Sequence, residues 1–329
     1  MHIVITGGAG FIGKKLAAAL LASDGITLEG SPKKKLERLT LFDVVEAAEG
    51  LPADTRIKII AGDITDKAQI ESLITSDVDA VFHLAAIVSA NAEADFDLGM
   101  AVNLDGTRHI LEACRRQGST PRVVFASSVA VYGGDMPTIG HDDLFLNPQT
   151  SYGAQKAASE LLVNDYSRKG FVDGRALRLP TIVVRPGKPN KAASTFASSI
   201  IREPLAGEPA ICPVSRDSVM YILSPRRVIE AFIHALALPD EVFGPARMLT
   251  LPGIAVSIGE VETALAKVAG KTVADRIRWT PDAHIQKIVS GWMPDFDAKR
   301  ARKLGFQPDE SIEEIIRAHI EDELGGVVG

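Results

Sequence analysis

The N-terminal segment constrains the fold of this chain most strongly, because an apolar strand runs directly into a glycine-rich turn and a helix. Residues 2–6 form the strand, and three glycines follow with GxxGxxG spacing, Gly7, Gly10 and Gly13. Such glycines let the backbone approach a pyrophosphate, which lies at the positive N-terminal end of the helix opened by Phe11 and Ile12. The segment therefore predicts a dinucleotide-binding unit, and a tight turn without a ligand is the alternative.

The first half of the chain continues this alternation of strands and helices. Apolar runs predict strands at 2–6, 39–43, 57–61, 79–84, 121–127 and 175–184. Amphipathic stretches predict helices at 11–22, 66–76, 98–117 and 152–169. Strands joined by crossover-length helical segments are typical of a parallel sheet covered on both faces. We therefore expect an α/β protein with a Rossmann-type, doubly wound parallel sheet.

A segment rich in Pro, Gly and Lys at 185–191 breaks this regularity and predicts a domain boundary. Residues 1–184 are expected to bind the dinucleotide, and residues 185–329 to form mainly a smaller α/β lobe that binds substrate, with some segments returning to the first domain. Helices in the second half are predicted at 194–205, 225–238, 257–269, 281–290 and 311–324.

Composition excludes several classes of protein. The net charge of -6 argues against nucleic acid as a partner, since phosphate binding usually needs a basic face. No apolar run approaches the 18 residues of a membrane span. The first strand begins at residue 2, which leaves no room for a removable signal peptide, so a cytoplasmic location is expected. The two cysteines, Cys114 and Cys212, form no CxxC and predict neither a disulfide scaffold nor a metal site.

Tyr152 and Lys156 carry the clearest chemical signal. Tyr152 is the only one of the four tyrosines that is followed by a Lys four residues later. Residues one helical turn apart share a face, so the ammonium can lower the phenol's pKa from about 10. A phenol so adjusted can exchange a proton with an alcohol or carbonyl near neutral pH. Together with the glycine turn, the pair predicts a nicotinamide-dependent oxidoreductase.

Asp43 ends the second predicted strand and indicates which nicotinamide cofactor is used. An acidic side chain there can accept hydrogen bonds from the ribose hydroxyls and would repel a 2′-phosphate, so NAD is favoured over NADP. The gap from Gly13 exceeds the usual spacing of about 20 residues, and the Lys-rich segment 30–38 accounts for the excess. An Asp that only caps a helix or turn is the alternative.

Polar and small residues also follow the third and fourth predicted strands. Asp63, next to Ile64, could face the adenine amino group, whereas Thr65 or Asp66 could simply cap the next helix. Small residues suit the close approach of a cofactor in the segment after the fourth strand, which contains Leu84, Ala85 and Ala86. The preceding His83 reads as a packed histidine. Asn103 is expected to support the active-site backbone, with a position on the helix surface as the alternative.

Ser127 and Ser128 end the fifth predicted strand, at the edge where ligands bind in open α/β sheets. A hydroxyl there can donate a hydrogen bond to a substrate oxygen while the Tyr transfers a proton. Serine hydrolase chemistry is the competing interpretation, but it requires a Gly-x-Ser-x-Gly turn. The flanking Ala126 and Val129 exclude that turn.

The ordered motifs of the first half resemble those of the extended short-chain dehydrogenase/reductase family. The matching segments are TGGAGFIG at 6–13, Asp43, GDITD at 62–66, HLAA at 83–86, VNLDGT at 102–107, SSVAVYG at 127–133 and YGAQK at 152–156. The resemblance implies that Ser128 is the catalytic hydroxyl and Tyr152 the acid/base. It implies that Lys156 assists Tyr152 and holds the nicotinamide ribose, and that Ser127, Pro180 and Ile182 also line the cofactor.

Many members of that family act on nucleotide sugars, but the second half of this chain departs from their pattern. Those members commonly carry an Arg-x-x-Asn segment that contacts the sugar diphosphate, whereas here the segment ends in Thr181. Segments 178–193 and 224–227 look instead like the D-erythronate dehydrogenase group, whose members oxidise a four-carbon sugar acid with NAD. The resemblance implies a small sugar acid as substrate, with the contacting residues expected among Ser128, Thr181, Arg185, Lys188, Lys191 and Arg216.

The sequence thus predicts an NAD-dependent dehydrogenase of a small hydroxy acid. A nucleotide-sugar epimerase or dehydratase with tightly bound NAD is one alternative, and a catalytically silent NAD-sensing or scaffold protein is another. Extended family members often pair the helices predicted here at 98–117 and 152–169 in a dimer contact, so a homodimer is expected. Net reduction of NAD would distinguish the dehydrogenase from the epimerase or dehydratase and from the silent protein.

Overall fold

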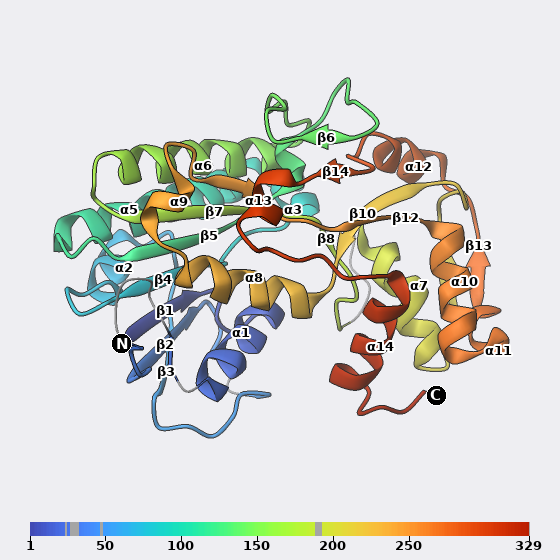
Figure 1. The fold of residues 1–329 in the computed structure, drawn as a ribbon, viewed down its shortest axis with the longest axis horizontal. Coiled ribbons are helices and arrows are strands. Elements are labelled where there is room, and N and C mark those ends of the chain that lie inside the picture. Colours follow the sequence, from blue (N-terminus) through green and yellow to red (C-terminus); the bar gives the residue numbers. More distant parts are fainter. Residues whose placement is uncertain (24, 27–32, 47–48, 188–192, 329) are drawn as a thin grey trace. The chain divides into compact units, whose positions relative to one another are not determined.

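The computed structural model describes residues 1–23, 25–26, 33–46, 49–187 and 193–328 (Figure 1). The chain divides into two compact units that interleave along the sequence. The first comprises residues 1–131, 150–178 and 229–249, and the second comprises residues 132–149, 179–228 and 250–329.

The first unit is built on a seven-stranded sheet with the order β11-β7-β5-β4-β1-β2-β3. Its strands are β1 (His2–Thr6), β2 (Arg38–Asp43), β3 (Ile57–Ala61), β4 (Ala80–His83), β5 (Arg122–Ser128), β7 (Asp173–Leu179) and β11 (Met248–Thr250). The pairs β3–β2, β2–β1, β1–β4 and β4–β5 are parallel. This order is that of a Rossmann-type doubly wound sheet, so the predicted fold class is confirmed.

Helices cover both faces of this sheet (Figure 1), with α5 (Gly106–Gln117) and α6 (Ser151–Arg168) on one face and α1 (Phe11–Ala22) and α8 (Pro225–Ala237) on the other. Shorter elements join them: α2 (Lys67–Leu73), α3 (Ser89–Ala94), α4 (Phe96–Gly99), the 3₁₀ turn η2 (Val129–Val131) and α9 (Asp240–Phe243). Because both faces are covered, the central strand β1 is buried along its whole length.

Two elements that the sequence predicted as continuous are divided in the structure. The predicted helix 98–117 is α4, a π-helical segment η1 (Met100–Asp105) and α5. The predicted strand 175–184 is divided at Pro180 into β7 and the short β8 (Thr181–Ile182). Proline has no N–H to donate within a sheet, so the strand cannot continue through it.

The described residues of the second unit form three small sheets. The strands β12 (Ile254–Ser257), β10 (Val219–Leu223) and β8 form one sheet, β9 (Ala210–Cys212) pairs with β13 (Ile277–Trp279), and β6 (Gly140–His141) pairs with β14 (Phe296–Asp297). Its helices are α7 (Thr195–Leu205), α10 (Ile258–Ala269), α11 (Lys271–Ala274), α12 (Ala283–Ser290), α13 (Lys299–Lys303) and α14 (Ile312–Glu323).

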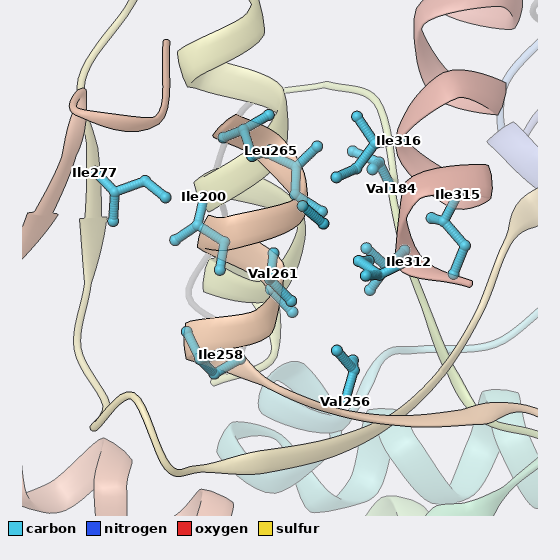
Figure 2. Close-up of a cluster of buried hydrophobic side chains, with 14 of the residues drawn as sticks. Val184, Ile200, Val256, Ile258, Val261, Leu265, Ile277, Ile312, Ile315 and Ile316 are labelled. Atoms are coloured by element: carbon cyan, nitrogen blue, oxygen red, sulfur yellow. The ribbon is translucent and has the colours of Figure 1, made fainter. Parts of the chain in front are cut away.

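Figure 2 shows the core of the second unit, where apolar side chains of α7, α10 and α14 meet, among them Ile200, Leu265 and Ile316. Ser257 begins α10 with a capping box, in which its hydroxyl accepts from the Glu260 N–H and the Glu260 carboxylate accepts from the Ser257 N–H. Among the described residues, no helix combines the length and the apolar character needed to cross a membrane.

Candidate active site

The glycine turn after β1 requires residues without a side chain. Gly7 has a left-handed φ of +72°, and a Cβ on it would lie 2.7 Å from the backbone nitrogen of Ala85. A Cβ on Gly13 would collide with the Gly7 carbonyl oxygen. The Gly10 N–H donates to that same oxygen at 3.1 Å, and Gly10 precedes the first residue of α1. The turn therefore brings the backbone of β1, α1 and the β4 loop into close contact.

The N-terminal end of α1 fits an anionic group. No side chain caps its first amides, and its first turn, which contains Phe11 and Ile12, has no acidic residue. Backbone N–H groups and the helix dipole both favour negative charge at such an end. Combined with the close backbone approach at Gly7 and Gly13, these residues fit the pyrophosphate of NAD.

Asp43 lies at the end of β2, beside the glycine turn. Its carboxylate oxygen Oδ2 accepts a hydrogen bond from the Ala9 N–H at 3.0 Å, and the residue is half-buried. The adjacent Gly8 N–H donates to the Phe42 carbonyl at 3.2 Å. These two bonds hold the carboxylate at the edge of the sheet that its predicted ribose contact requires.

The ends of β3 and β4 place the other predicted cofactor residues. Asp63 is exposed, and its carboxylate accepts from the Thr65 N–H at 2.9 Å. Ile64 is buried in the core of the first unit, and Asp66 caps α2. Three half-buried residues follow β4, Leu84, Ala85 and Ala86. The contact of Asp63 with adenine stays a prediction.

His83 is a packed histidine, as its position at a strand end indicated. Its ring nitrogens lie 2.7 Å from the Thr6 hydroxyl and 2.9 Å from the Thr107 hydroxyl. Burial, followed by the nearby Lys156 charge, lowers the pKa of His83 to about 3. The imidazole therefore stays neutral and joins β1, β4 and α5.

Asn103 is buried inside the π-helical segment and clamps the loop after β4. Its side-chain oxygen accepts from the Ile87 N–H at 2.8 Å, and its amide nitrogen donates to the Ile87 carbonyl at 3.1 Å. The same nitrogen donates to Gln155 Oε1 at 2.7 Å, which links the loop to α6. The position on the helix surface that the sequence left open is excluded, because Asn103 is 1% exposed.

Tyr152 and Lys156 lie one turn apart near the start of α6, which Thr150 caps by accepting from the Gly153 N–H at 3.1 Å. The Lys156 ammonium is 5.7 Å from the centre of the Tyr152 ring and 4.6 Å from that of Phe125. Burial lowers the pKa of Lys156 to about 7, against an opposing effect of Glu160.

The two serines that end β5 have different surroundings. Lys156 Nζ donates to the carbonyl of the preceding Ala126 at 2.8 Å, which fixes the end of the strand next to α6. The Ser128 hydroxyl is half-buried and accepts from the Ala130 N–H at 3.1 Å. The Ser127 hydroxyl is buried and donates to the Glu160 carboxylate.

Glu160 and Arg178 form a buried ion pair behind these residues. Glu160 has no exposed surface, and Arg178 of β7 donates to its two oxygens at 2.7–3.1 Å. Neither residue was expected among the site residues from the sequence. The signal was present, because Glu160 follows Tyr152 and Lys156 at positions i+8 and i+4 and so shares their helix face.

The second unit contains the remaining described candidates. Pro180 and Ile182 are buried and Thr181 is half-buried. Arg185 Nε donates to the Ile182 carbonyl at 3.2 Å. Arg216 pairs with Glu262, and its guanidinium stacks 4.2 Å from the Trp279 ring centre. The candidates Lys188 and Lys191 lie outside the described residues.

Comparison with known proteins places the chain. The sequence pattern of a family described as "NAD dependent epimerase/dehydratase family" matches residues 3–248. A protein of Cupriavidus necator called D-erythronate dehydrogenase is 53% identical over 98% of each chain. A protein of Haemophilus influenzae with the same name is 43% identical over 98% of this chain and 100% of its own.

A solved structure is also similar over the whole chain. It is described as the nucleoside-diphosphate-sugar epimerase from Agrobacterium tumefaciens, and it is 46% identical with a TM-score of 0.93. The match covers 100% of this chain and 96% of that one. The resemblance inferred from the motifs of the first half is thereby confirmed.

Proposed function

Because the chain belongs to the NAD dependent epimerase/dehydratase family, we propose that it oxidises D-erythronate, or a close aldonic acid, to the keto acid with NAD. The observation that carries this proposal is the 53% identity to a D-erythronate dehydrogenase over 98% of both chains. That identity extends through residues 185–329, where most of the candidate substrate residues lie. Agreement in the glycine turn alone would support only a shared cofactor.

The residues of α6 and β5 supply the acid/base chemistry. Tyr152 as phenolate takes the proton of the substrate hydroxyl, and the Lys156 ammonium beside the ring favours the phenolate over the phenol. Ser128 donates a hydrogen bond to the substrate oxygen and orients it. Bound NAD supplies the hydride acceptor. The family resemblance also assigns the nicotinamide ribose to Lys156, which lies on the same helix face as Tyr152.

A small sugar acid needs a fixed positive charge for its carboxylate, and the planar guanidinium of Arg suits bidentate contact. Arg185 is the strongest described candidate, because it is half-buried and lies four residues after Thr181, whereas the side chain of Arg216 is exposed. We expect no more than two of the four predicted cations to contact the substrate. Thr181 adds a hydroxyl that can bind a substrate oxygen.

The rival function is a nucleotide-sugar epimerase, which the description of the Agrobacterium structure favours. The Arg-x-x-Asn segment of such enzymes is represented here by Arg178 to Thr181. Arg178 is 7% exposed and paired with the buried Glu160, and Thr181 lacks the amide of Asn. Those two positions argue against a diphosphate ligand.

Purified protein should be mixed with NAD and each of several sugar acids while NADH absorbance is followed. D-erythronate or a close aldonic acid should give net NADH. UDP-glucose and UDP-galactose should neither bind nor interconvert. Epimerisation of a UDP-sugar without net NADH would overturn the proposal, and binding of NAD without any turnover would favour the silent NAD-sensing alternative.

We also propose that the enzyme is a homodimer and that it acts in the cytoplasm.

A further inference from the structure

The buried face of α6 carries a charged residue, Glu160, in addition to the acid/base pair. Tyr152, Lys156 and Glu160 follow one another at intervals of four residues, so they lie along a single face of the helix. Lys156 is 2% exposed and Glu160 is fully buried. Placing two opposite charges in the interior is costly unless each is paired and hydrogen-bonded, so the groups that hold each charge determine what it can do.

The Glu160 carboxylate is held from two strands. Ser127 at the end of β5 donates its hydroxyl to Oε1, and Arg178 of β7 donates from Nε and Nη2 to both oxygens. Three hydrogen-bond donors that come from outside the helix therefore determine where this negative charge lies. Lys156 is held in turn by its bond to the Ala126 carbonyl, one residue before Ser127.

We propose that Glu160 is a positioning residue that keeps Lys156 charged beneath Tyr152, with Ser127 and Arg178 holding the carboxylate in place. The inference deepens the proposed function, because a charged Lys156 is what favours the Tyr152 phenolate. Burial favours the neutral amine and Glu160 opposes that effect, and the two together leave the pKa of Lys156 lowered to about 7.

The other groups around Lys156 do not supply this charge. His83 of β4 is neutral, because its pKa is lowered to about 3, and Phe125 and Ala126 of β5 contribute a ring and a carbonyl. On α6, Tyr152 is the residue whose phenolate form the Lys156 charge favours. Glu160 is therefore the carboxylate that acts on Lys156, and Arg178 holds that carboxylate in place through its hydrogen bonds.

The charge of Lys156 can be measured without substrate or cofactor. Protein containing lysine labelled with ¹³C at Cε is titrated by NMR, and the Lys156 signal is identified by its loss in Lys156→Met. In Glu160→Gln we expect the pKa of Lys156 to fall by about one unit or more, the usual effect of removing an adjacent opposite charge. Glu112→Gln is the control, because it removes a hydrogen-bonded carboxylate of α5 that is not among the groups acting on Lys156.

Glu160→Gln leaves Arg178 buried without its carboxylate, which can prevent folding. The double variant Glu160→Gln/Arg178→Gln removes both charges and avoids that penalty. The pKa of Lys156 should fall in it as well. An unchanged Lys156 pKa in whichever of these variants folds would overturn the inference.

Turnover of D-erythronate gives a separate readout. If the NMR titration shifts as expected but the unmodified protein does not oxidise the acid, the inference stands and the proposed function fails. If the protein oxidises the acid while the titration of Lys156 is the same in all variants, the proposed function stands and Glu160 has only a structural role.

Discussion

Two cations in this molecule have the same kinds of neighbours in opposite surroundings. Lys156 of the first unit lies 4.6 Å from the Phe125 ring centre and one turn from Glu160, and it is buried. Arg216 of the second unit lies 4.2 Å from the Trp279 ring centre and pairs with Glu262, with 56% of its side chain exposed.

The difference shows that burial decides what such a group of residues does. Burial disfavours the charged form of Lys156 and lowers its pKa. Away from water the remaining charge acts more strongly on its neighbours, so Lys156 can influence Tyr152. An exposed ion pair is screened by water and salt and contributes about 0–1 kcal/mol. Arg216 with Trp279 therefore reads as a surface contact between segments of the second unit.

The largest expected effect is on turnover and follows from removing the Tyr152 hydroxyl. Tyr152→Phe keeps the ring and removes the proton-transfer group, so kcat should fall by roughly 10²–10⁴-fold. Cofactor affinity, measured by NAD titration, should change little. Tyr166→Phe is the matched control, because its hydroxyl donates to Glu112 on the neighbouring helix α5. Near-full activity in Tyr152→Phe would eliminate that residue as the acid/base.

Lys156→Met tests whether burial shifts the pKa of Lys156, because such a shift makes the free energy of unfolding depend on pH. The folded pKa of about 7 lies below the unfolded value of about 10.4. Between these values the unfolded state binds more protons, so the lysine makes stability rise with pH across that window. Relative to Lys156→Met, the unmodified protein should gain several kcal/mol from pH 7 to 10. Denaturant unfolding at a series of pH values measures this.

Arg216→Met is the control for that experiment, since arginine stays protonated throughout the window. Its unfolding free energy should run parallel to that of the unmodified protein. If Lys156→Met also runs parallel, Lys156 keeps an ordinary pKa in the folded state, and the two cations do not differ in the way described above.

The comparison also separates what the sequence could predict from what it could not. The Rossmann-type sheet and most element boundaries followed from apolar periodicity and from the glycine turn, where the left-handed φ of Gly7 and the contact of Gly13 with Gly7 are local requirements. The π-helical segment around Asn103 was not predictable, because its stabilising partners Ile87 and Gln155 lie 16 and 52 residues away. The same holds for Arg178, whose pairing with Glu160 is a tertiary contact.

The second unit was harder to interpret for the same reason. Its described sheets pair short strands that are distant in sequence, such as β6 with β14. Strands this short have too few residues for an alternation of apolar and polar side chains to predict them. The return of residues 229–249 to the first unit likewise depends on packing, including the contact of Phe232 with Phe82 of β4. Charge alone could not distinguish Arg185 from Arg216, because their different partners are set by the fold.

Arg185 and Arg216 should differ in their effect on substrate binding. If Arg185 binds the substrate carboxylate, Arg185→Met should raise KM for D-erythronate by roughly 10-fold or more, the usual effect of losing a hydrogen bond to a charged group. Arg216→Met should change KM by less than about 3-fold, since it removes an exposed pair. Steady-state kinetics with varied substrate measures both, and the reverse order would assign the carboxylate to Arg216.

Cofactor choice should respond to Asp43. The unmodified protein should bind NAD more tightly than NADP, and Asp43→Ala should narrow that preference by about 10-fold, because it removes both the ribose contact and the repulsion of a 2′-phosphate. Fluorescence titration with both cofactors tests this, with Asp63→Ala, in the loop after the neighbouring strand β3, as a comparison. Tighter binding of NADP to the unmodified protein would overturn the assignment.

The smallest expected effect on activity concerns assembly, and it compares exposed apolar side chains of the two units. Leu111 of α5 is buried within its own unit, but Leu161 of α6 is 61% exposed, and Phe96 of the neighbouring α4 is 57% exposed. Phe145 of the second unit is 83% exposed. If α5 and α6 form the dimer contact, Leu161→Glu should place a charge in an apolar interface and give a monomer, while Phe145→Glu should leave the dimer intact.

Light scattering at micromolar concentration measures the mass of each variant. Activity per subunit should stay within about 2-fold in both, because neither side chain contacts the acid/base residues and surface substitutions usually have small effects. A monomeric mass for the unmodified protein would remove the dimer from the proposal. A dimer that survives Leu161→Glu but dissociates in Phe145→Glu would move the contact to the second unit, and the exposed face of α6 would then have no role in assembly.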